Sequence, residues 1–411
     1  MFITIKKIKI PKILENIFED LKSKQAKPIV VGGCVRDSFL NKEIKDYDIE
    51  VYNIDSIDSL KSVISKYKEP KLVGKSFGVL KLSVDDLDFD FSLPRTEIKT
   101  GFKHTDFEII LDSNLSYKEA SRRRDFTINS IGYDYFENRF LDPFGGIKDL
   151  KKREIKHIDD KTFIEDSLRV YRALGFASRF NFKISKKTKK LCKKIVENKE
   201  LEHLPKQRVF DEFKKIFLKS KKPSIALKLF DEFKIFFISF KSSYKAVDKL
   251  AKYLNKNSFD EFRKIYLFFS LILKNQKEDD ILNFLQNITD DKNLIKNILT
   301  LCKNRTKLDE KELKKLSLVL KLQDLILLEK SLEKKDIKKI EKLSKKLDIF
   351  DKPLKISLQG KDLISLGFKE SKEFKEILDF ALKLQIENNM SKDEIIEKIF
   401  NKYNQLLYIF I

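Results

Sequence analysis

The sequence predicts an α/β region followed by an all-helical region, because glycine and strand-like patterns are confined to its first part. Nine of the eleven glycines lie between Gly32 and Gly175, and the other two are Gly360 and Gly367. Tight turns favour glycine, whereas helix interiors disfavour it. Beyond Pro223 the apolar residues recur at helical spacing between lysine-rich faces. We therefore expect the α/β region to end near residue 150.

The bulk composition is typical of a globular protein of about two or three domains. The chain has 411 residues, 42% of them hydrophobic and 36% charged. We expect no membrane association, because no run of about 18 apolar residues occurs, and the N-terminus lacks the apolar core of a signal peptide. Cys34, Cys192 and Cys302 lie too far apart for a zinc site or a disulfide framework. This pattern fits the reducing cytoplasm.

The formal net charge of +22 indicates a polyanionic partner such as RNA. A second explanation stays open. Lysine, isoleucine, asparagine and phenylalanine are all abundant, as expected from an A/T-rich genome. The charge therefore permits RNA binding without demonstrating it.

The segment that organises the chain is PIVVGGCVRDSFLNKEIKDYDIEVY, residues 28–52. It predicts a buried strand at Ile29–Val31, a turn at Gly32 and Gly33, and a short helix that carries Arg36. A second strand follows at Tyr47–Tyr52. Free N–H groups at the start of such a helix can hold a phosphate.

Asp46 and Asp48 stand at the start of the second strand. Residues i and i+2 of a strand project from the same face, so the two carboxylates lie close together and repel each other unless a cation binds between them. Mg²⁺ prefers one or two carboxylates together with substrate phosphates. The segment thus indicates a nucleoside-triphosphate site with metal-assisted phosphoryl transfer, although Gly-Gly or D-x-D alone would be an ordinary turn or charged surface.

The ordered combination of a strand, GG-x-V-R-D and D-x-D resembles the signature of the class II CCA-adding enzyme (tRNA nucleotidyltransferase) and bacterial poly(A) polymerase family. The resemblance implies Asp46 and Asp48 as catalytic metal ligands for Mg²⁺, and Gly32, Gly33 and Arg36 as nucleotide-binding residues. It also implies an α/β nucleotidyltransferase head followed by an all-α neck, body and tail. We expect these four parts at residues 1–150, 151–220, 221–350 and 351–411.

The remainder of the head predicts a helix at Ser56–Lys68 and strands at Lys71–Val84 and Leu87–Ser92. Asp90 on the last strand is a candidate third carboxylate for the metal, with a solvated strand face as the alternative. The segment Pro94–Phe107 has few regular signals and predicts a mobile loop, which resembles the flexible loop of the family.

A basic helix is expected at Ser116–Arg124, and it runs into RRDFTINSI. Arginine can pair with phosphate through two hydrogen bonds. A solvated charged turn is the alternative for an isolated R-R-D. In the family this segment recognises ribose, which implies nucleotide-binding roles for Arg124, Asp125 and Asn129.

The next motif is EDSLRVYRALGFASRF, for which we expect one amphipathic helix over Glu165–Phe180. Asp166, Arg169 and Arg172 would then share one face, as in a surface ladder of salt bridges. The family's E-D-x-x-R motif implies instead that Asp166 and Arg169 read the base edge and that Arg172 contacts the nucleotide. Gly175 stands where many members carry a further arginine.

The segment Leu201–Phe217 resembles the neck of the family, with Gln207 in place of the usual glutamate before Arg208. We expect this helix to act as scaffolding. The segment from Ile356 onward resembles the tRNA-contacting tail.

The resemblance implies template-independent addition of C, C and A to the 3′ end of tRNA from CTP and ATP, with release of pyrophosphate. The basic R-R-F-x-L-x-H-V stretch of poly(A) polymerases is absent from Val73–Leu82, which favours CCA addition. Four alternatives stay open: addition of CC alone, addition of A alone, poly(A) synthesis, and an RNA-binding protein with an inactive head. The expected partners are tRNA, CTP and ATP, with no membrane and no zinc.

Overall fold

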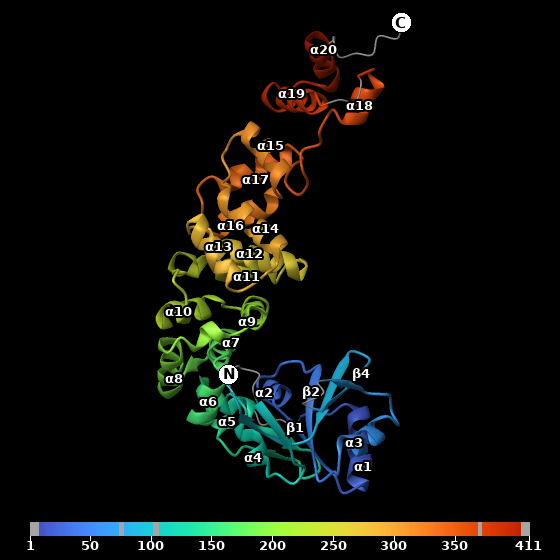
Figure 1. Ribbon diagram of the computed structural model, residues 1–411, viewed down its shortest axis with the longest axis vertical. Coiled ribbons are helices and arrows are strands. Elements are labelled where there is room, and N and C mark those ends of the chain that lie inside the picture. The colour runs from blue at the N-terminus through green and yellow to red at the C-terminus, as the bar shows by residue number, and fades with distance from the viewer. Residues whose placement is uncertain (1–7, 74–77, 102–106, 369–371, 404–411) are drawn as a thin grey trace. The chain divides into compact units, whose positions relative to one another are not determined.

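The computed structural model describes residues 8–73, 78–101, 107–368 and 372–403. The chain divides into two compact units, Met1–Lys241 and Ser242–Ile411, which are coloured blue to yellow-green and yellow to red in Figure 1. In the described residues no helix is both long and apolar enough to cross a membrane.

The first unit is built on a seven-stranded mixed sheet with the strand order β3-β4-β5-β2-β1-β8-β9. Its central strand β2 runs parallel to β5, and all the other neighbouring strands are antiparallel. The strands are β1 (Lys27–Val31), β2 (Asp46–Tyr52), β3 (Lys71–Val73), β4 (Val79–Val84), β5 (Leu87–Ser92), β8 (Gly132–Asp134) and β9 (Arg139–Leu141).

Short helices connect these strands and pack on the sheet. They are α1 (Lys12–Ser23), α2 (Gly33–Phe39), α3 (Ile57–Ile64), α4 (Tyr117–Arg122) and the 3-10 helix η1 (Thr127–Asn129). Helix α2 packs against β1 and β2. Helix α4 begins with a capping box between Ser116 and Glu119, and its Ala120 joins the buried cluster of Ile29, Val31 and Tyr52.

Two expectations for the head were wrong. The single strand predicted at Lys71–Val84 is divided into two antiparallel strands, β3 and β4, and residues 74–77 between them lie outside the described residues. The predicted loop at Pro94–Phe107 contains a strand, β6 (Arg95–Lys99), which pairs with β7 (Phe107–Leu111). This ribbon stands apart from the main sheet, so its sequence lacks the apolar alternation that signals a half-buried strand. Residues 102–106 are not described.

Helices dominate the remainder of the first unit. They are α5 (Gly146–Lys152), α6 (Asp160–Glu165), α7 (Arg169–Phe180), α8 (Lys186–Glu197), η2 (Glu200–His203), α9 (Lys206–Lys219) and α10 (Ser224–Phe233). Residue 150 therefore lies inside α5 and not in a linker. The predicted all-α neck also contains a short parallel pair, β10 (Glu154–Ile155) with β11 (Lys183–Ile184).

The described part of the second unit is helical. Its helices are α11 (Tyr244–Leu254), α12 (Glu261–Leu273), α13 (Glu278–Gln286), α14 (Lys292–Lys303), α15 (Glu310–Val319), α16 (Leu322–Ser331), α17 (Ile337–Lys346), α18 (Gly360–Ser365), α19 (Phe374–Glu387) and α20 (Lys392–Tyr403), and η3 (Lys241–Ser243) precedes them. Leucine and isoleucine from α15 to α17 form one core, and those from α18 to α20 form another. The predicted order of an α/β region followed by helices is confirmed.

Candidate active site

A cavity of about 370 Å³ lies in the first unit, beside the β2 strand and α2. This volume is within the usual range of small-ligand sites. All the predicted site residues except Asp46 and Asp90 line it, although they come from four separate segments of the chain. Arg123, Phe176 and Arg208 complete the lining.

The carboxylates of β2 form one edge of the site. Asp48 lines the cavity, and Asp46 lies two residues earlier on the same strand face; both residues are exposed. Asp90 of β5 stands directly opposite Asp48 in the parallel register, but its carboxylate pairs with Lys81 at 3.1 Å. Burial, followed by the negative charges of Asp90, Glu50 and Asp46, raises the pKa of Asp48 even though Arg124 opposes the shift.

This arrangement fits a divalent cation that is shared with a substrate. In the described part of the chain no three side chains of His, Cys, Asp or Glu gather as a metal site, so the protein alone does not supply a full ligand set. Mg²⁺ is often held by one or two carboxylates together with substrate phosphates. The crowded negative charge around Asp48 is the feature that such a cation would relieve.

Gly32 allows the backbone to approach this edge. Its φ of 75° and ψ of −131° are accessible to glycine but strained for other residues. A Cβ atom at this position would lie 3.0 Å from Nη1 of Arg124 and 3.1 Å from Oδ2 of Asp48. The Gly-Gly turn thus brings main chain, carboxylate and guanidinium into close contact.

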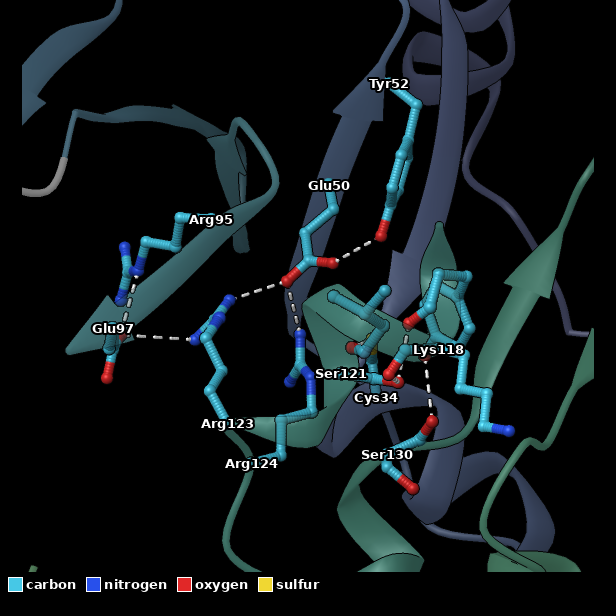
Figure 2. A network of polar contacts seen from close by, with 12 residues as sticks. Cys34, Glu50, Tyr52, Arg95, Glu97, Lys118, Ser121, Arg123, Arg124 and Ser130 are labelled. Carbon is cyan, nitrogen blue, oxygen red and sulfur yellow. Dashed lines mark hydrogen bonds and ion pairs between the residues drawn. The ribbon is translucent and has the colours of Figure 1, made fainter. Parts of the chain in front are cut away.

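Glu50, the next inward-facing acid of β2, fixes the two arginines of the R-R-D motif (Figure 2). Its Oε1 accepts hydrogen bonds from Nη2 of Arg123 at 2.7 Å and from Nη2 of Arg124 at 2.8 Å, and the Tyr52 hydroxyl donates to Oε2 at 3.0 Å. Glu50 is 1% exposed. Burial opposes its ionisation, but Arg124 and Arg123 outweigh this and lower the pKa of Glu50.

The β6–β7 ribbon is tied to the same network. Nη1 of Arg123 lies 3.6 Å from Oε1 of Glu97, and Nε of Arg95 donates to that oxygen at 3.0 Å (Figure 2). An ion pair therefore connects part of the predicted loop to an arginine of the cavity.

Asp125 faces away from Arg124, toward the helices. Its Oδ1 accepts from the backbone N–H of Phe126 and from Nδ2 of Asn129, both at 2.8 Å, and its Oδ2 accepts from Nε and Nη2 of Arg172 at 2.8 and 2.6 Å. Burial opposes ionisation, but Arg172 and Asn129 outweigh it and lower the pKa of Asp125. A carboxylate has about four acceptor positions, so a ribose hydroxyl would have to displace one of these bonds. The ribose role of Arg124 and Asp125 stays a prediction.

The expectation that Asp166, Arg169 and Arg172 share one helix face was wrong for Asp166. Helix α6 ends at Glu165, Asp166 is extended at φ −123° and ψ 95°, and α7 begins at Arg169. The Asp166 carboxylate accepts from the N–H of Leu168 at 3.2 Å, which favours a break before the new helix. Its Oδ2 lies 3.9 Å from Nε of Arg169.

Arg169 is anchored by main-chain carbonyls. Nη1 donates to the carbonyl oxygen of Thr162 and Nη2 to that of Arg123, both at 2.7 Å. Its buried Nε makes no hydrogen bond, and the same is true of Nε in Arg123 and Arg124. The three guanidiniums line the cavity, but these Nε–H groups are buried and have no hydrogen-bond partner.

Sequence reasoning missed Phe176 as a site residue and took the Arg208 helix as scaffolding only. Phe176 stacks on Phe180 and lies beneath the guanidiniums of Arg36 and Arg172, 5.3 and 5.4 Å from its ring centre. Phe176 belongs to the apolar face of its helix, as a core residue would, so the sequence pattern did not mark it as a site residue. Arg208 is exposed and borders the cavity from α9; as an arginine in the first turn of a neck helix it could have been proposed.

Gly175, inside α7, has room for a methyl group. A Cβ would meet Cγ1 of Ile216 at 3.7 Å and Oε2 of Glu212 at 3.8 Å, which are ordinary contacts. Because glycine in a helix interior costs about 0.5–1 kcal/mol relative to alanine, Gly175→Ala should raise the free energy of unfolding by this amount in urea denaturation. Gly146→Ala is the opposite control, since its Cβ would lie 2.1 Å from the Thr127 carbonyl oxygen. If Gly175→Ala were less stable than the unmodified chain, the space for a methyl group between α7 and α9 would be contradicted.

Comparison with known proteins covers both units. A family model for the poly A polymerase head domain matches residues 29–156, and one for the probable RNA and SrmB-binding site of polymerase A matches residues 181–257. The multifunctional CCA protein of Neisseria meningitidis is 34% identical over 186 residues, which are 45% of this chain and 42% of that protein. The chain belongs to the class II family of CCA-adding enzymes and poly(A) polymerases.

A second relative in the family is the CCA-adding enzyme of Buchnera aphidicola (subspecies Acyrthosiphon pisum). It is 33% identical over 236 residues, 57% of this chain and 54% of that enzyme. The chain thus spans about half the length of these curated relatives.

Solved structures of the family share the fold. A CCA-adding enzyme in its apo form II gives a TM-score of 0.73 at 22% identity, over 96% of this chain and 97% of that one. The Thermotoga maritima CCA-adding enzyme complexed with tRNA gives 0.69 at 21% identity, over 96% and 97%. Identities this low establish the fold alone.

Proposed function

We propose that this protein is a tRNA nucleotidyltransferase that adds C, C and A to the 3′ end of tRNA, using CTP and ATP and releasing pyrophosphate. The observation that carries the proposal is the single cavity in which Asp48, the Gly32–Gly33 turn, and the arginines of two separate motifs meet. The similarity to a multifunctional CCA protein and to a CCA-adding enzyme supports it.

The reaction we propose is in-line attack of the RNA 3′-hydroxyl on the α-phosphate of the nucleotide. Asp46 and Asp48 would hold Mg²⁺, which supplies charge neutralisation at the reacting phosphates when bound. Gly32 lets the triphosphate approach the main chain, because a side chain there would meet Asp48 and Arg124. Glu50 holds the guanidinium of Arg124 beside Asp48, so a cationic donor is already oriented before the nucleotide arrives.

The other end of the cavity would bind the base. Asp166 offers acceptor oxygens and Arg169 offers donors, and both are fixed by main-chain contacts before any ligand binds. A rigid pair of this kind can select bases by hydrogen-bond pattern without a nucleic-acid template. Arg208 borders the same region from the neck helix.

We predict that Asp166→Ala will lower the discrimination between CTP and ATP by about 10-fold or more, since a paired base contact is worth about 1–3 kcal/mol. The measurement is the ratio of kcat/KM for the two nucleotides on tRNA that ends in CC. Asp166→Asn keeps a side-chain oxygen that can accept from the Leu168 N–H but loses the negative charge. It therefore distinguishes an effect on base selection from an effect on the start of the helix. Glu197→Ala, at an exposed position of α8, controls for loss of a negative charge. Unchanged discrimination in Asp166→Ala would refute the base-selecting role.

The test of the proposed function is a 3′-extension assay. Transcribed tRNAs that end before CCA, after C, and after CC are each incubated with CTP, ATP or both in the presence of Mg²⁺. Extension that stops at CCA supports the proposal. Addition of only C or only A would indicate a split activity, and long A tails on any RNA would indicate a poly(A) polymerase. Tight tRNA binding without incorporation would indicate an inactive head.

We also propose the division into head, neck, body and tail at 1–150, 151–220, 221–350 and 351–411, with the tail on the tRNA. We also propose that the reaction takes place in the cytoplasm. Limited proteolysis with and without tRNA tests the tail, because bound RNA should protect it from cleavage.

A further inference from the structure

A second, smaller cavity of about 170 Å³ adjoins the candidate active site. Arg36, Arg172 and Phe176 line both cavities. The smaller one, which we call the side chamber, is completed by residues that do not line the larger: Gly175 and Arg179 of α7, and Glu212, Lys215 and Lys219 of α9. Gly175 contributes no side chain, so the chamber lies open where a larger residue would fill it.

The lining of the side chamber carries an excess of positive charge. Five of its residues are lysine or arginine, and one is acidic. Lys215 neutralises Glu212 at 2.7 Å, and Arg172 is already paired with Asp125. Arg179 reaches Asp37 at 3.2 Å, whereas no side chain in the described part of the chain pairs with Lys219.

A further cation lies next to this group. Lys42 is placed over the Phe180 ring, 4.4 Å from its centre. Burial and the nearby charge of Arg179 lower the pKa of Lys42 to about 8, with Arg36 and Lys221 adding to the shift and Asp37 opposing it. Asp37 is thus surrounded by more positive charge than it can balance, and an anion in the chamber would relieve the repulsion.

The incoming nucleotide accounts for only part of this chamber. Arg36 and Arg172, which the family resemblance assigns to the nucleotide, line both cavities, whereas Arg179, Lys215 and Lys219 line the side chamber and not the larger cavity. The groups proposed for its phosphates, Gly32, Asp48 and Arg124, line only the larger cavity, and so do Asp166 and Arg169, proposed for its base. The side chamber has less than half the volume of the larger cavity, so it suits a phosphate group and not a nucleoside triphosphate. The other polyanion of the reaction is the RNA.

We propose that the side chamber binds a phosphodiester group of the RNA strand whose 3′ end reacts, with Arg179 and Lys219 as the phosphate-contacting residues. This proposal rests on the proposed function, because it takes the larger cavity as the nucleotide site. The contact would hold the 3′-terminal nucleotides beside the nucleotide while the strand is extended, and it carries no sequence information.

The test measures the affinity of the full chain for a fluorescent tRNA transcript that ends in CC, over a range of KCl concentrations and without nucleotide. Lys219→Gln should weaken binding about 3–10-fold and lower the slope of log Kd against log salt by about 0.7–0.9, the loss of one phosphate contact. Arg179→Gln should act in the same direction. Lys190→Gln, an exposed lysine on α8, is the matched control and should leave the slope unchanged.

A transcript shortened by four 3′ nucleotides identifies the strand, because the difference between Lys219→Gln and the unmodified chain should then disappear. Equal slopes for Lys219→Gln and Lys190→Gln would overturn the proposal. The proposal would also be overturned if Lys219→Gln changed the KM for CTP or the inhibition by pyrophosphate and left the tRNA affinity unaltered. That result would assign the chamber to the nucleotide. The binding readout does not require incorporation, so it still decides this proposal if the extension assay fails.

Discussion

Asp48→Asn is expected to lower the rate of nucleotide incorporation by at least about 10³-fold, or about 4 kcal/mol of transition-state stabilisation. Asp46 and Asp48 are both exposed on β2, and Asp48 is the one that lines the cavity. An amide is a poor ligand for a divalent cation, so the substitution removes the charge that would hold Mg²⁺ at the phosphates. The measurement is single-turnover incorporation of CMP into tRNA with saturating enzyme.

A stability measurement separates this effect from misfolding. The pKa of Asp48 is raised above its ordinary value of 3.8, so its ionised form destabilises the fold at neutral pH, and the penalty disappears as the group protonates at low pH. Asp48→Asn should therefore resist urea at least as well as the unmodified chain at pH 7, and this advantage should shrink near pH 4. Asp86→Asn, in the exposed turn before β5, is the control. Full activity of Asp48→Asn would refute the metal assignment.

Much of the site was predictable because its residues lie in short segments with strong local rules. The alternation of β2 places Asp46, Asp48 and Glu50 on one face from spacing alone. Gly32 was predictable as a turn, and its φ of 75° is the conformation that a glycine permits. The contrast between a glycine-containing sheet region and helices with few glycines likewise predicted the order of the two regions.

The parts that sequence did not predict depend on contacts between distant segments. The break at Asp166 interrupts a continuous apolar pattern, because its carboxylate binds the Leu168 N–H in place of a helical bond. Arg124 and Asp125 are adjacent in sequence, yet one turns to Glu50 on β2 and the other to Arg172 on α7. No local rule separates two neighbouring charges in this way.

The β6 strand was missed for a related reason. Among the described strands it pairs with β7 alone, and it carries the Arg95–Glu97 ion pair in place of an apolar face. Its Glu97 also contacts Arg123, a residue of the cavity that is distant in the sequence. Glu50 likewise binds partners that are distant in the sequence, Arg123 and Arg124.

Glu50→Gln is expected to lower the free energy of unfolding by about 3 kcal/mol or more, the usual cost of breaking a buried ion pair by removing one partner. Glu50 is 1% exposed and is the shared acceptor for Arg123 and Arg124, whose side chains are 18% and 16% exposed. Without the carboxylate, two guanidiniums are left in a poorly solvated site with no balancing charge. Chemical denaturation followed by circular dichroism measures the loss.

The dependence on pH distinguishes the lost charge from lost packing. The pKa of Glu50 is held below its ordinary value of 4.5, so its contribution is present above that pH and is lost as the pH falls through the folded-state pKa. The difference in stability between Glu50→Gln and the unmodified chain should therefore be largest at neutral pH and should narrow below about pH 4.5. Glu69→Gln, an exposed partner of Lys61, should have little effect. If the difference in unfolding free energy stayed constant from pH 7 to pH 3, Glu50 would stabilise the fold through packing and not through its charge. Another residue would then have to hold Arg124 beside Asp48.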